Sequence, residues 1–63
     1  MKLDNYDINF IKKVELIISQ KYSISKQNLD NLIFKFKNMM IEDSQYVYHY
    51  NEEYWSEYLI QNI

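Results

Sequence analysis

Apolar residues in the first third of the chain recur at intervals that place them on one face of a helix. Their spacing of three and four positions matches the helical repeat, and polar residues occupy most positions between them. We therefore expect a helix from about Asp7 to Gln20, in which the Asp7 carboxylate accepts from free backbone N–H groups at the start. The stripe consists of Tyr6, Phe10, Ile11, Val14, Ile17 and Ile18, and Leu16 falls opposite it.

A second apolar stripe with the same period follows a short interruption. We expect a helix from about Lys26 to Ile41, with Ser25 as its N-cap because a serine hydroxyl accepts readily from the first free N–H groups. Two large apolar residues, Phe34 and Ile41, depart from the stripe and should lie near each other on the outward side. The stripe itself consists of Leu29, Leu32, Ile33, Phe36 and Met40.

The last third of the chain is compatible with two structures. A single helix from about Ser44 to Gln61, capped by Asp43, places Val47, Tyr50, Tyr54 and Tyr58 on one stripe. The segment Tyr46–Tyr50 also alternates as a strand does and is rich in strand-forming residues, and a shorter helix capped by Asn51 would then follow it. Because a two-stranded ribbon is only marginally stable alone, the pattern favours the single helix.

Three amphipathic helices with short connections predict an all-α fold, a small three-helix bundle that forms one domain over residues 1–63. The aromatic third stripe adds a condition, because a buried tyrosine hydroxyl needs a hydrogen-bond partner. Some of these rings should therefore lie at the rim of the core or in an interface. The predicted core consists of Phe10, Val14, Ile17, Ile18, Leu29, Leu32, Ile33, Phe36, Met40, Val47, Tyr50, Tyr54 and Tyr58.

The composition argues against chemistry carried out by the chain itself. The sequence has no Cys and one His, which excludes disulfides, thiolate zinc sites and His-rich metal sites, and it has no Gly for a phosphate-binding loop. His49 and Glu53 could face each other on a helix with Ser56 nearby, but no further residue completes a catalytic site. We predict a non-enzymatic protein with no catalytic residue, no metal and no cofactor.

The residue usage also indicates a source and a compartment. Ile, Asn, Lys and Tyr are enriched while Gly, Ala, Pro and Arg are absent, which indicates an AT-rich gene of a low-GC bacterium or of its phages or plasmids. No leader peptide and no apolar segment of about 20 residues is present, so we expect a complete, soluble, cytoplasmic gene product with no membrane partner.

Small size points to a partner, and the charge distribution indicates its kind. A domain this short is marginally stable without disulfides, a metal or a partner, and the partner can be a second copy of the chain itself. Residues 42–63 carry five acids and no Lys, whereas residues 1–41 carry all seven Lys. An acidic segment rich in Tyr and Trp suits contact with a basic protein, such as a nucleic-acid-binding enzyme. The predicted partner-binding residues are Glu52, Glu53, Tyr54, Trp55, Glu57, Phe34 and Ile41.

Direct nucleic-acid binding is the alternative that the sequence leaves open. The first two predicted helices could form a helix-turn-helix-like unit or a homodimeric regulator, with Lys26, Lys35 and Lys37 on or beside the second helix. The chain lacks Arg, the residue that reads guanine best, and its net charge is −2. We therefore do not expect DNA or RNA to be the main partner.

In its short length, acidity and lack of motifs the chain resembles small inhibitors encoded by phages and plasmids, such as anti-CRISPR and anti-restriction proteins. The resemblance rests on no motif and transfers the role of no residue. It implies an inhibitor that occludes a basic functional surface of its target.

Overall fold

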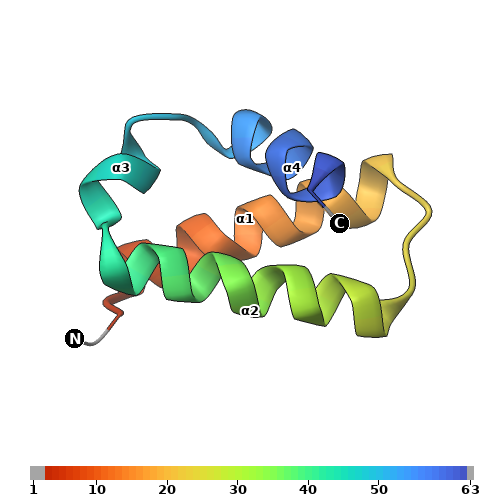
Figure 1. Cartoon of the computed structure of the whole chain (residues 1–63), viewed down its shortest axis with the longest axis horizontal. Coiled ribbons are helices and arrows are strands. Elements are labelled where there is room, and N and C mark those ends of the chain that lie inside the picture. Colours follow the sequence, from red (N-terminus) through yellow and green to blue (C-terminus); the bar gives the residue numbers. More distant parts are fainter. Residues whose placement is uncertain (1–2, 63) are drawn as a thin grey trace.

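A computed structural model describes residues 3–62, which form four helices and no strand (Figure 1). The helices are α1 (Asn5–Lys21), α2 (Lys26–Glu42), α3 (Ser44–Tyr48) and α4 (Glu52–Gln61). The protein is therefore a small all-α helical bundle, which confirms the predicted fold class. The alternative of a strand over residues 46–50 is wrong, because most of that segment is helical.

Each helix begins at a polar side chain that accepts a hydrogen bond from the backbone of its first turn. The predicted caps Ser25 and Asp43 are confirmed at the starts of α2 and α3. For α1 the prediction of Asp7 is wrong, since Asp4 is the N-cap and its Oδ1 accepts from the Asp7 N–H at 2.8 Å. Asp7 completes a capping box, because its own carboxylate accepts from the Asp4 N–H at 3.2 Å.

The third helix is interrupted between residues 49 and 51, so the predicted continuous helix Ser44–Gln61 is wrong. The side chain of Asn51 accepts from the Tyr54 N–H at 2.9 Å and starts a new helix. Glu52 and Glu53 follow in the first turn of α4, where negative charge is favourable. The shorter final helix capped by Asn51, which the sequence offered as an alternative, is therefore confirmed.

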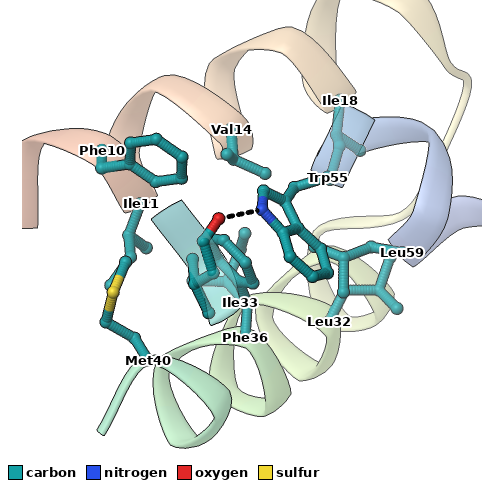
Figure 2. Close-up of a cluster of buried hydrophobic side chains, with 11 residues drawn as sticks. Phe10, Ile11, Val14, Ile18, Leu32, Ile33, Phe36, Met40, Trp55 and Leu59 are labelled. Atoms are coloured by element: carbon teal, nitrogen blue, oxygen red, sulfur yellow. Dashed lines mark hydrogen bonds between the residues drawn. The ribbon is translucent and has the colours of Figure 1, made fainter. Parts of the chain in front are cut away.

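This interruption changes which face of α4 is buried. Tyr50, Tyr54 and Tyr58 are predicted core residues, yet Tyr50 and Tyr54 are each 37% exposed and Tyr58 is half-buried. Trp55 and Leu59, one helical turn apart, enter the core instead (Figure 2). Without a continuous helix the phase set by Val47 is not carried into α4, and the buried stripe shifts by one position.

The core is closed by packing α4 against α1 and, less extensively, against α2 (Figure 1). Of the core residues predicted on α1 and α2, Leu29 is only half-buried, while Ile17 is buried as predicted although it is not part of the main cluster. The other core residues predicted on α1 and α2 are confirmed. The cluster consists of Phe10, Ile11, Val14, Ile18, Leu32, Ile33, Phe36, Met40, Val47, Trp55 and Leu59.

Two hydrogen bonds fix the short helix α3 in this arrangement. Trp55 donates from Nε1 to the backbone carbonyl of Val47 at 2.7 Å, and both residues are fully buried (dashed line in Figure 2). The Tyr48 hydroxyl donates to the Asp7 carboxylate, which joins α3 to the first turn of α1. This bond holds the pKa of Asp7 below its usual value, while burial and the same bond raise the pKa of Tyr48.

Candidate functional site

Four tyrosines on α3, α4 and the segment between them form an accessible surface, which we call the tyrosine face: Tyr46, Tyr50, Tyr54 and Tyr58. The rings of Tyr50 and Tyr54 stack with centroids 4.1 Å apart and planes 17° apart. The rings of Tyr54 and Tyr58 continue this order at 6.1 Å and 18°. Three nearly parallel rings therefore run along one side of α4, and Tyr46, which is 46% exposed, extends the face onto α3.

The buried indole of Trp55 supports this face from within. Its ring contacts each of the four tyrosine rings edge-on, at centroid distances of 5.7 Å to Tyr46 and 5.0 Å to Tyr54. The remaining distances are 5.9 Å to Tyr50 and 5.2 Å to Tyr58. Because the indole is itself held by its hydrogen bond to Val47, these contacts restrict the orientations open to the tyrosine rings.

Trp55 is also one of the predicted partner-binding residues, but the structure places it in the core and not on the surface. Its side chain is 0% exposed, so it cannot reach a partner in this fold. The expectation that it anchors a contact directly is wrong, because the helix break turns it inward and turns the tyrosines outward. Tyr46, Tyr50 and Tyr58 are therefore not among the partner-binding residues predicted from the sequence. The signal that could have identified them is Asn51 followed by two acids, a typical helix start.

The predicted acidic residues lie on or near α4 but differ in their availability. Glu53 is paired with Lys21 of α1 at 2.6 Å, and this bond raises the pKa of Lys21. Glu52 is half-buried in the first turn. Glu57 is exposed and forms no ion pair with any of residues 3–62. It is thus the carboxylate most available to a basic partner.

A shallow depression of about 200 Å³ brings these features together, since Tyr54, Tyr58, Glu57 and Gln61 line it. Partial removal from water, together with the nearby Tyr46, Tyr50 and Tyr58, raises the pKa of Tyr54. The depression therefore offers two aromatic rings, one carboxylate and one amide. This set of groups suits a cationic side chain, which can lie against a ring while it pairs with the carboxylate.

The remaining predicted residues, Phe34 and Ile41, lie on α2 away from the tyrosine face. Phe34 is 66% exposed, which agrees with its expected outward position, and Ile41 is half-buried. Phe34 lines a groove of about 490 Å³ between α1 and α2. The groove is lined by Leu3, Ile8, Ile11, Lys12, Glu15, Asp30, Ile33, Phe34 and Lys37, and Ile41 is not among them.

The residues considered for catalysis each have other contacts. His49 lies against the ring of Tyr50, and the Glu53 carboxylate is engaged by Lys21. The Ser56 hydroxyl is buried and donates to the Glu53 backbone carbonyl at 2.7 Å. Within residues 3–62 no group of three His, Cys, Asp or Glu side chains is placed to hold a metal ion. No helix in this part of the chain is long and apolar enough to span a membrane.

Comparison with known proteins yields no relative. No protein-family model, no curated protein and no solved structure matches the chain.

Proposed function

We propose that this chain is a small non-enzymatic regulator or inhibitor that binds a partner protein and occludes a basic functional surface of it. The observation that supports the proposal is the tyrosine face, where exposed, nearly parallel rings lie beside the free carboxylate of Glu57. Tyrosine is among the residues that contribute most to protein interfaces. Rings already held by Trp55 lose little conformational entropy on binding, which favours affinity.

The contact combines steering and anchoring. The acids of residues 42–63 create a negative field that attracts a basic surface before contact, and this effect acts mainly on the association rate. An arginine or lysine of the partner then lies against the Tyr58 ring, at the end of the row of stacked rings, and pairs with Glu57, which covers the partner's own basic site. A nucleic-acid-binding enzyme presents such a site. A phage or plasmid of a low-GC bacterium, acting in the host cytoplasm, is the setting in which this inhibitor would operate.

The experiment compares three tagged forms of the chain as baits in a lysate of a low-GC bacterium. They are the natural sequence, the double variant Tyr54→Ser with Glu57→Lys, and the control Glu42→Lys. Glu42 is exposed and lies outside the tyrosine face, so the control matches the charge change without altering the rings. Circular dichroism first establishes that all three forms have the same helical content.

We expect the natural sequence and Glu42→Lys to retain a basic protein that the double variant loses. The purified target should lose its activity when the natural chain is added, and its affinity should fall as salt is raised. Equal retention of the same proteins by all three baits at every salt concentration would contradict the role of the tyrosine face. Retention of DNA or RNA itself would instead support the nucleic-acid-binding alternative, with the lysines of α2 as the contact.

A further inference from the structure

The groove between α1 and α2 has an ordered arrangement of charge that the tyrosine face does not explain. The two helices run antiparallel and are joined by the short segment 22–25 (Figure 1). Among the groove residues, Glu15 and Asp30 lie toward this connection, whereas Lys12 and Lys37 lie further from it. Phe34 lies between the acidic and basic positions of α2. The groove is therefore acidic at one end, aromatic in the middle and basic at the other end.

We propose that the groove binds the same groove of a second copy of this chain, and that the two copies lie antiparallel. In a symmetric dimer each surface must complement itself. A twofold axis that lies in the interface and runs across the groove reverses the direction of the second copy. Lys37 then faces Asp30 of the second copy, and Lys12 faces Glu15. A twofold axis along the groove would instead place like charges together, so the charge order selects the antiparallel arrangement.

Phe34 supplies the apolar centre of this contact. Its side chain is two-thirds exposed in the single chain, and the neighbouring Ile8 is also exposed. Near the twofold axis the two copies of Phe34 contact each other and lose water together, which is the position that interface anchors prefer. Within residues 3–62, the one ion pair that involves a charged residue of the groove joins Asp30 to Lys26; it is long at 3.8 Å and exposed, and so holds Asp30 weakly.

The dimer and the proposed protein-binding function use different parts of the chain. The groove is lined by α1, α2 and Leu3, whereas the tyrosine face belongs to α3, α4 and their connection. Dimerisation therefore leaves both tyrosine faces free, and the inference stands whether or not the proposed function is correct.

The test is sedimentation equilibrium of the purified chain over a wide range of concentration, with variants that exchange the charges. We expect a monomer–dimer equilibrium for the natural sequence. Phe34→Ser should raise its dissociation constant about tenfold or more, because truncation of a central aromatic anchor has at least that effect. Asp30→Lys and Lys37→Glu alone should each weaken the dimer. The double variant should restore it, since the exchanged charges again face opposite partners. Leu16→Ser, at an exposed apolar position outside the groove, is the matched control and should leave the equilibrium unchanged.

Three results would overturn the inference. The first is a chain that remains monomeric up to concentrations of about 1 mM, where even weak association is visible. The second is a dimer that Phe34→Ser does not weaken, which would place the interface elsewhere. The third is failure of the charge exchange to restore a dimer that the single variants weaken, which would exclude the antiparallel arrangement. Because Phe34 is exposed, its replacement by Ser should leave the melting temperature of the dilute monomer within a few degrees, and this measurement verifies that the variant is folded.

Discussion

Replacement of Trp55 by Phe tests the arrangement on which the tyrosine face depends. The change removes the Nε1–H that donates to the Val47 carbonyl in a fully buried site, and it leaves a smaller ring beside Phe36. The Tyr50 N–H also donates to that carbonyl at 3.3 Å, so the carbonyl does not become completely unpaired. The lost hydrogen bond should therefore cost about 1 kcal/mol, near the typical value.

The void left by the smaller ring adds a second cost on the order of 1 kcal/mol, so the total is about 2 kcal/mol. A domain of this length has a free energy of unfolding of roughly 3–9 kcal/mol, so Trp55→Phe should still fold. At roughly 4–8 °C for each kcal/mol, the melting temperature measured by circular dichroism should fall by about 8–16 °C.

The matched control is Tyr54→Phe, which keeps a ring on the surface and removes only a partly exposed hydroxyl. It should change the free energy of unfolding by less than about 0.5 kcal/mol. If Trp55→Phe melted within about 2 °C of the natural sequence, the indole would not be the buried, hydrogen-bonded support described above.

Two further substitutions test the N-cap of α4 and the hydrogen bond that joins α3 to α1. Asn51→Ala removes the acceptor for the Tyr54 N–H and should cost about 1 kcal/mol in urea unfolding, whereas Asn51→Asp, which keeps an acceptor, should cost little; equal effects would show that the cap is unimportant. Tyr48→Phe removes the hydrogen bond that lowers the pKa of Asp7. Because the Asp7 pKa is lower in the folded chain than in the unfolded chain, where it is near 3.8, its ionisation stabilises the fold above pH 3.8. This stabilisation is lost as the pH falls through the pKa of the folded state. The stability difference between the natural sequence and Tyr48→Phe should therefore stay constant from pH 5 to 8 and shrink below about pH 3.8, and a difference that persisted in acid would contradict this role for Asp7.

The sequence predicts the first two helices well because their apolar stripes are clean and their ends carry recognisable caps. Ser25 and the stripe of α2 are where periodicity places them, and Phe34 points outward as expected. For α1 two details are wrong: the N-cap is Asp4 rather than Asp7, its partner in the capping box, and Tyr6 of the predicted stripe is 69% exposed. Local patterns sufficed here because nothing interrupts the helical period.

The last third could not be predicted from periodicity, because the period restarts at Asn51. Val47, Tyr50, Tyr54 and Tyr58 would share one face of an unbroken helix. Because the helix is broken between α3 and α4, these residues do not form one buried stripe. What selects the broken form is tertiary: Trp55 fills the space between α1 and α2, and its N–H pairs with a carbonyl of α3. The candidate site carries the same error: Trp55, predicted to contact a partner, is buried, and Tyr50 and Tyr54, predicted to be core residues, are exposed.

The way in which the helices start has a consequence for how this sequence can drift during evolution. Each helix is capped by Asp4, Ser25, Asp43 or Asn51, and no residue among 3–62 has the positive φ angle for which glycine is preferred. Ser, Asp and Asn perform nearly equally as caps, and their AT-rich codons are close neighbours, since that of Asn differs by one base from those of the other two. The turns can therefore exchange these residues by single, nearly neutral steps. A gene under strong pressure toward A and T can keep the fold without ever encoding a glycine or a proline.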